Sequence, residues 1–154
     1  MKKNVVFMAC VVNKDRVKKY SNFDYFHYYI KNMHILLLVA HGSRREESNI
    51  EIESLSEKIS TLKPKEFDKV IPAFLEFASP SIPEAIKECA DLGATKVTIL
   101  PYFLSAGVHI TRDIPNEISE ASQNTPGLDI QIANYFGSRD EIAEILMKTA
   151  LDIK

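Results

Sequence analysis

The chain has 154 residues, of which 45% are hydrophobic and 26% charged, and its formal net charge is −2; this indicates one globular domain with its own core. No stretch approaches the roughly 20 apolar residues that cross a bilayer, so we expect no membrane span. Cys10 and Cys89 have no paired spacing, which argues against a disulfide scaffold or a thiolate metal site and favours the reducing cytoplasm.

Residues 1–32 differ in composition from the rest of the chain. They hold seven of the 19 Lys and Arg residues, two of the 21 acidic residues and half of the Tyr and Phe residues. Such a segment can bind RNA or single strands, but no recognised nucleic-acid module accompanies it, so we expect no nucleic-acid partner. The apolar run at 5–9, before Cys10, is too short to be the apolar region of a secretion signal. We interpret 1–32 as an N-terminal extension, or as the result of a misassigned start upstream of Met33, and 33–154 as one domain.

The first predicted elements follow residue 33. Residues 35–39 are a continuous apolar run, typical of a strand that is buried on both faces of a parallel sheet. Four apolar residues then recur at helical spacing and predict an amphipathic helix: Ile52, Leu55, Ile59 and Leu62. Residues 70–76 predict a second strand, and Pro72 within it indicates an edge position because proline cannot donate a ladder hydrogen bond.

Strands and helices continue to alternate along the remaining sequence. Ser81 and Glu84 form a capping-box signature for a second helix, which Gly93 ends. A third strand is predicted over 96–100, and a fourth over 128–133. Between them, a third helix is predicted from three apolar residues before Pro126: Ile114, Ile118 and Ala121. A final helix is expected to be capped by Ser138 and Glu141 and to carry Ile142, Ile145, Leu146 and Thr149.

This alternation predicts an α/β fold. We expect a doubly wound, flavodoxin-like sheet of four parallel strands in the order 2-1-3-4, with helices on both faces. In that order the chain reverses direction between strands one and three, and ligands of such folds bind at this switch point.

Two histidines follow the strands that flank the switch point. His41 comes directly after the first strand, and Gly42 leaves room for a ligand to approach the backbone. His109 comes after the third strand, so both imidazoles can face one crevice. Either histidine alone is more often structural, but their joint placement favours a site. Two imidazoles without a thiolate suit Co, Ni, Fe or Zn and would hold the ion loosely enough to pass it on.

Three charged residues lie near the same predicted edge. Glu76 ends the second strand and could assist proton removal, although a solvated carboxylate is an equally good interpretation of its position. Arg44 and Arg45 could bind carboxylates of an anionic substrate or pair with the Glu-rich helix that follows. Ala40 stands where histidine phosphatases need an arginine, and the usual nucleotide and esterase motifs are missing.

Three segments occur in a fixed order: VAHGSR at 39–44, FLEFASPSIP at 74–83 and LPYFLSAGVHITRDIP at 100–115. Together they resemble the small sirohydrochlorin chelatases, over about residues 33–152, and the last segment is the most specific. The resemblance implies ATP-independent insertion of Co²⁺, and in methanogens Ni²⁺, into sirohydrochlorin, on the way to cobalamin or to the nickel cofactor of methane formation. It also implies a homodimer and no permanently bound cofactor.

The resemblance further implies a role for each matching residue. His41 would be a metal ligand and proton acceptor, and His109 the second metal ligand. Glu76 would assist catalysis and contact the substrate, together with His109 and the loop before it: Leu104, Ser105, Ala106, Gly107 and Val108. Iron insertion for sirohaem, or a noncatalytic metal or tetrapyrrole carrier, would use the same ligands and remain alternatives.

Overall fold

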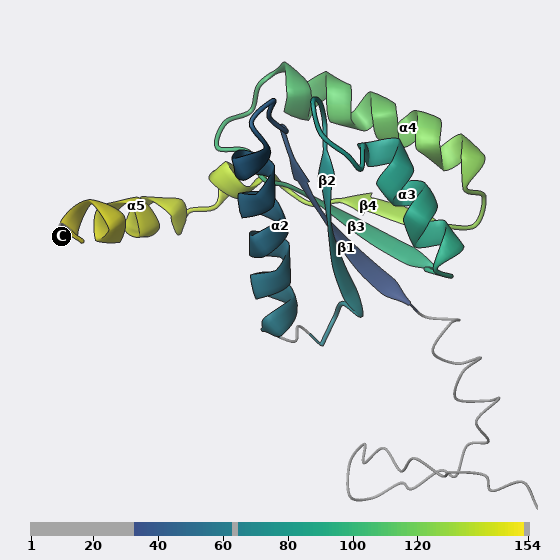
Figure 1. The fold of residues 1–154 in the computed structure, drawn as a ribbon, viewed down its shortest axis with the longest axis horizontal. Helices are drawn as coiled ribbons and strands as arrows, with labels where there is room; N and C mark the ends of the chain where they lie inside the picture. The colour runs from purple at the N-terminus through teal and green to yellow at the C-terminus, as the bar shows by residue number, and fades with distance from the viewer. Residues whose placement is uncertain (1–32, 63–64, 153–154) are drawn as a thin grey trace, which may run out of the picture.

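Four strands form one parallel sheet in the order β2-β1-β3-β4 (Figure 1). In the computed structural model, which describes residues 33–62 and 65–152, these are β1 (His34–Ala40), β2 (Lys69–Phe74), β3 (Lys96–Pro101) and β4 (Asp129–Ile132). The predicted α/β class and strand order are therefore confirmed. β2 is an edge strand, as Pro72 indicated, and Pro72 pairs with Leu38 of β1. The extension expected at 1–32 lies outside the described residues.

Helices cover both faces of the sheet. α2 (Glu46–Thr61) lies on one face, and α3 (Ile82–Asp91) and α4 (Ile114–Asn124) lie on the other (Figure 1). From Ile35 to Ala40 every residue of β1 is buried, as expected for a central strand between two helical layers. The main core joins alternate residues of β1, such as Leu37, to the apolar faces of α3 and α4.

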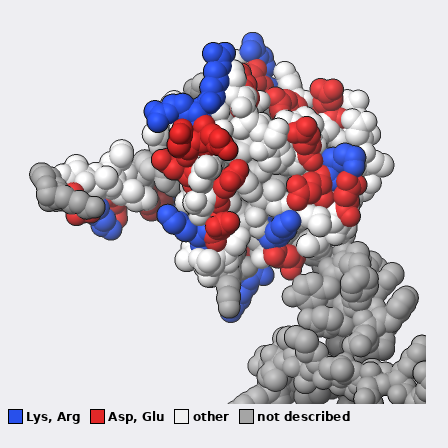
Figure 2. All heavy atoms as spheres, in the orientation of Figure 1, with Lys and Arg blue, Asp and Glu red and all other residues white. Residues whose placement is uncertain are grey.

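The acidic residues of α2 face solvent. Figure 2 shows acidic side chains gathered over this helix, and five of them are exposed: Glu46, Glu47, Glu51, Glu53 and Glu57. The helix ends at Thr61, one residue before Leu62, which is 79% exposed and not part of the apolar face. The prediction that Leu62 belongs to the apolar face was wrong, because Leu62 lies beyond the final helical turn.

The start of α3 confirms the predicted capping box. The Ser81 hydroxyl accepts a hydrogen bond from the Glu84 main-chain N–H, and the Glu84 carboxylate accepts one from the Ser81 N–H. Both donors belong to the first turn, where the helix itself offers no partner. Gly93, with φ 85°, follows the last residues of the helix as predicted.

The cap predicted for the last helix is wrong. The Ser138 hydroxyl donates to the Tyr135 carbonyl inside a short turn, η2 (Phe136–Ser138), and Glu141 pairs with Arg139. These nearby partners satisfy both side chains before the helix begins. α5 (Ile142–Leu151) follows and projects away from the sheet (Figure 1), with four large apolar side chains exposed: Ile145, Leu146, Met147 and Leu151.

Within residues 33–62 and 65–152, no helix combines the length and the apolar character that a bilayer span requires.

Candidate metal centre

The carboxyl ends of β1, β2 and β3 meet at one edge of the sheet. His41 follows β1 directly, and Glu76 comes two residues after the end of β2. The main-chain N–H of Glu76 donates to the His41 carbonyl at 2.9 Å, so the pairing of β1 with β2 continues as far as these two residues. His109 opens a π-helical turn, η1 (His109–Asp113), after the loop that follows β3.

The structure brings together His41, Glu76 and His109. Each offers one ligand atom, and these atoms all lie within 4.8 Å of one another. The two imidazole rings lie edge to face, with centroids 4.9 Å apart and an interplanar angle of 75°. His41 and Glu76 are exposed and His109 is half-buried. Two nitrogens and one oxygen around a common point can hold a divalent transition-metal ion and leave further positions open.

In both histidines Nδ1 has an oxygen partner outside the cluster of His41, Glu76 and His109. The His41 Nδ1 lies 3.1 Å from the Gly42 carbonyl oxygen, and the His109 Nδ1 lies 2.9 Å from Asp113 Oδ2. A carbonyl or carboxylate oxygen only accepts hydrogen bonds, so the proton of each neutral ring is on Nδ1. Nε2 of each ring then carries the free lone pair that a metal ion or a proton requires.

Asp113 has a second partner. Its other carboxylate oxygen, Oδ1, accepts a hydrogen bond from Arg112 Nε at 2.8 Å. The Arg112 guanidinium, and to a smaller degree His109, lower the pKa of Asp113 below its usual range, so this carboxylate is ionised at neutral pH.

Gly42 allows the strand ends to approach each other. Its φ is +86°, and a β-carbon there would lie 1.8 Å from the Glu76 main-chain oxygen. We expected the space beside Gly42 to admit a ligand; the main chain of Glu76 fills it instead. The ladder hydrogen bond between His41 and Glu76 draws the two backbones together at this point.

Apolar side chains lie beside the cluster formed by His41, Glu76 and His109. Phe77 is 53% exposed and has a φ of 61°, and its ring centroid lies 6.1 Å from that of His41. The loop expected to contact substrate, 104–108, is exposed throughout. Three more large apolar side chains on this side are exposed: Tyr102, Leu104 and Val108. Exposed apolar side chains at the rim of a polar cluster are typical of a ligand-binding surface.

Arg44 and Arg45, which follow His41 and Gly42, have different partners. Arg45 forms an exposed ion pair with Glu47 at 3.8 Å, so it pairs with the Glu-rich helix. The Arg44 guanidinium lies over the Phe77 ring, 4.9 Å from its centroid, and remains available to an anionic group.

An open cavity of about 240 Å³ lies next to the cluster, lined by Leu75, Glu76, Asp113, Asn116 and Glu117. One carboxylate oxygen of Glu117 is buried there without a hydrogen-bond partner among the described residues. Burial, and then the nearby carboxylates of Asp113, Glu120 and Glu76, raise the pKa of Glu117.

Sequence reasoning missed Phe77 and Asp113. Asp113 follows His109 by four residues, a spacing that places two side chains on one face of a helix and that could have indicated the contact. No comparable signal marked Phe77, because its position depends on how β2 ends beside β1.

Comparisons with known proteins agree with the fold and with the motifs. The pattern of the CbiX family matches residues 35–152. A sirohydrochlorin cobaltochelatase of Sulfurisphaera tokodaii is 36% identical over 121 residues, which cover 79% of this chain and 94% of that protein. A chloroplastic sirohydrochlorin ferrochelatase of Arabidopsis thaliana is 34% identical over 112 residues, which cover 72% of this chain and 48% of that one.

A solved structure of the sirohydrochlorin chelatase SirB from Bacillus subtilis, in complex with cobalt, is also similar. It aligns with a TM-score of 0.71 and 26% identity, over 79% of this chain and 51% of that chain. This chain therefore spans about half the length of SirB and of the Arabidopsis protein. Because the family pattern covers most of the sequence and the Sulfurisphaera relative aligns over nearly its whole length, this chain belongs to the CbiX family, the small sirohydrochlorin chelatases that its motifs resemble.

Proposed function

We propose that this protein inserts a divalent metal ion, Co²⁺ or Ni²⁺, into sirohydrochlorin without ATP, on the route to cobalamin or to the nickel cofactor of methane formation. The observation that carries the proposal is the convergence of His41, Glu76 and His109 on one point at an open edge of the sheet. The relatives named as sirohydrochlorin chelatases support the substrate.

The chemistry of insertion fits this arrangement. The ion must exchange its protein and water ligands for four ring nitrogens, while two pyrrole N–H protons leave. Three protein ligands leave coordination positions for the incoming nitrogens, whereas a closed four-ligand site would retain the ion. In this proposal His41 and His109 bind the ion through Nε2, and no permanently bound cofactor is needed.

Proton removal needs a base near the ring nitrogens. In this proposal His41 Nε2 accepts a proton once the ion has left it, since one lone pair cannot bind both at once. The Glu76 carboxylate is the second acceptor. The loop Leu104–Val108 and Phe77 contact the face of the macrocycle, and Arg44 pairs with one of its carboxylates.

Turnover distinguishes an enzyme from a carrier with the same ligands. Sirohydrochlorin absorption is followed without oxygen, with excess Co²⁺ and a small amount of protein. Many metallations per chain are expected, whereas a carrier would stop at one. The His41→Ala variant should lose at least about a hundredfold in rate, as is usual when a general base is removed. His34→Gln, at the opposite end of β1, is the matched control and should retain activity.

Iron insertion for sirohaem is the second candidate, and the Arabidopsis ferrochelatase is the observation that favours it. Imidazole affinity rises along the Irving–Williams series whatever the purpose of the site, so affinity alone does not decide between metals. Insertion rates measured with Co²⁺, Ni²⁺ and Fe²⁺ under the same anaerobic conditions show which metal the protein prefers. An Fe²⁺ rate well above the other two would replace cobalt or nickel by iron in the proposal.

We also propose that two copies form a homodimer through α5. This helix projects from the sheet and exposes four large apolar side chains, which a second copy would cover. Relatives of about twice the length support such an arrangement, because their second half could replace the second copy.

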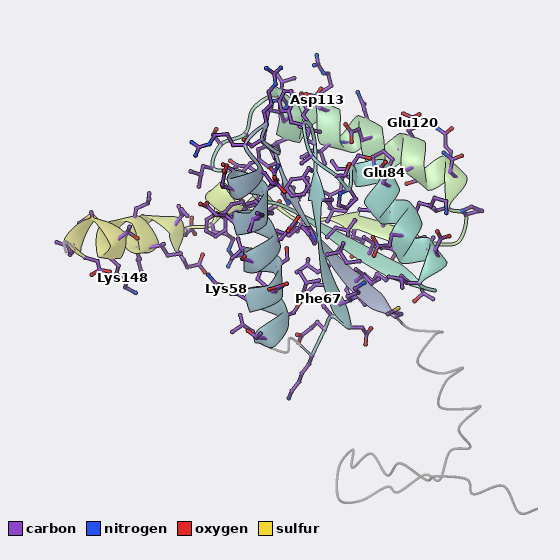
Figure 3. The ribbon with its side chains drawn as sticks, viewed as in Figure 1. Lys58, Phe67, Glu84, Asp113, Glu120 and Lys148 are labelled. Carbon is purple, nitrogen blue, oxygen red and sulfur yellow. The ribbon has the colours of Figure 1, made fainter. Side chains whose placement is uncertain are left out.

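The Leu146→Glu variant should sediment as a monomer where the wild type sediments as a dimer. Lys148→Glu, on the same helix (Figure 3), introduces the same residue at an already charged position and should remain a dimer. A wild-type protein that is monomeric at micromolar concentrations would contradict the proposed dimer.

A further inference from the structure

We propose that Asp113 is the positioning residue of the metal centre: through His109 Nδ1 it orients the imidazole and fixes the tautomer that presents Nε2 to the ion. The inference rests on the proposed function only in assigning His109 as a metal ligand.

The geometry of the Asp113 carboxylate carries the inference. One oxygen accepts from His109 Nδ1 at 2.9 Å, and the other accepts from Arg112 Nε at 2.8 Å. Two directional partners on opposite oxygens hold the carboxylate in one orientation, and the carboxylate in turn holds the ring. Metal-bound histidines in proteins commonly have such a partner on the second ring nitrogen, which fixes the ring and strengthens the donor.

The local backbone supports the same arrangement. His109 and Asp113 are the first and last residues of the π-helical turn, and the N–H of Ile114 donates to the His109 carbonyl. Single π-helical turns are rare and occur frequently at functional sites. Asp113 lies at the N-terminal end of α4, at the end of the sheet that carries the cluster, whereas Glu120 lies farther along the helix (Figure 3).

The two histidines are therefore not equivalent. His41 Nδ1 has only the carbonyl of the adjacent Gly42 as a partner among the described residues, at 3.1 Å, and this oxygen carries no net charge. His109 Nδ1 has a carboxylate oxygen at 2.9 Å, and Arg112 holds the other oxygen of that carboxylate. Of the two rings, His109 is therefore the more firmly oriented.

The direct test is binding of Co²⁺ alone, followed by its visible absorption. Asp113→Ala should weaken Co²⁺ affinity about 10- to 100-fold and alter the absorption bands. Asp113→Asn should lose less Co²⁺ affinity than Asp113→Ala, because an amide oxygen still accepts from Nδ1–H. It should still lose some, because the amide carries no charge. Asp91→Asn is the matched control: it removes an aspartate that also pairs with a residue four positions earlier, Lys87, but on α3. Its affinity should equal that of the wild type.

A double-mutant cycle separates positioning from a general effect on folding. In a His109→Ala background, Asp113→Asn should have no further effect on Co²⁺ affinity, because the ring it positions is gone. An equal loss in both backgrounds would overturn the inference, and so would an Asp113→Ala variant with wild-type affinity and spectrum. A protein that binds Co²⁺ through this pair but never metallates sirohydrochlorin would refute the proposed function and leave this inference standing.

Discussion

The backbones of Gly42 and Glu76 are in direct contact: a β-carbon at Gly42 would lie 1.8 Å from the Glu76 carbonyl oxygen. The adjacent His41 carbonyl accepts a hydrogen bond from the Glu76 N–H. The spacing of the His41 and Glu76 backbones is thus set by main-chain contacts. The backbones of two of the three cluster residues are preorganised in this way, which lowers the cost of assembling the site around an ion.

The Gly42→Ala variant tests this contact. We expect a loss of about 2 kcal/mol or more in the free energy of unfolding, because the φ of +86° is unfavourable for alanine and the added carbon would displace Glu76. Co²⁺ affinity should fall as well. Gly127→Ala is the control: its φ is +91°, but open space surrounds it, so only the backbone cost applies. If thermal unfolding showed the same loss of stability for both variants, the proposed role of the contact would be contradicted.

Phe77 is expected to show opposite effects on stability and on substrate binding. Its φ of 61° is unfavourable for a large side chain that is 53% exposed. Phe77→Gly should therefore retain or raise the midpoint of thermal unfolding. The same variant should raise the KM for sirohydrochlorin, because it removes an apolar surface beside His41. Phe77→Leu keeps an apolar side chain but not the ring, so its KM should lie between those of the wild type and the glycine variant. An unchanged KM in the glycine variant would exclude Phe77 from the binding surface.

His34 should make the folded state sensitive to mild acid. Burial, and then the charge of Lys96, lower the pKa of His34 below its ordinary value of 6.5, against the opposing effect of a Glu66 main-chain hydrogen bond and the carboxylates of Asp68 and Asp129. The unfolded chain consequently binds a proton at a higher pH than the folded chain does. Stability should fall as the pH drops below about 6.5 towards the lower folded-state pKa.

Urea unfolding of the wild type and of His34→Gln, at several pH values from about 7.5 to about 5, measures this effect. The glutamine variant lacks the titrating ring, so its stability should decline less over this interval. The site is far from the cluster, at the end of β1 near Phe67 (Figure 3), and the comparison therefore reports folding alone. A constant difference between the two proteins across the interval would show that His34 does not titrate in this way.

Cys89 should be unreactive in the native protein. Its side chain is fully buried on α3, and this burial, with a smaller contribution from the charge of Glu88, raises the pKa of the thiol to about 12. Since the thiolate is the reactive form, iodoacetamide at pH 8 should modify Cys89 only after unfolding. Mass spectrometry of the peptide that contains Cys89, with and without urea, measures this. Rapid modification without urea would mean that α3 opens readily.

Local patterns in the sequence are enough to predict the sheet and most of its covering helices. The apolar run of β1, the proline of β2 and the capping box at Ser81 are local signals, since each depends on residues a few positions apart. The order 2-1-3-4 is the common one for such doubly wound sheets, and this order assigns His41 and His109 to one edge of the sheet. The cap expected at Ser138 was wrong because a nearer partner, the Tyr135 carbonyl, takes its hydroxyl.

The completion of the site depends instead on tertiary packing. Glu76 reaches the two histidines because β2 pairs with β1, a contact between residues more than 30 positions apart. The same pairing places Phe77 on the rim and leaves room for nothing larger than glycine at position 42. The orientation of His109 depends on a π-helical turn and on the Asp113 carboxylate, and the exposure of α5 depends on where the chain leaves the sheet. The His109–Asp113 contact is local, but the other features arise from packing between distant segments, and patterns of neighbouring residues do not contain that information.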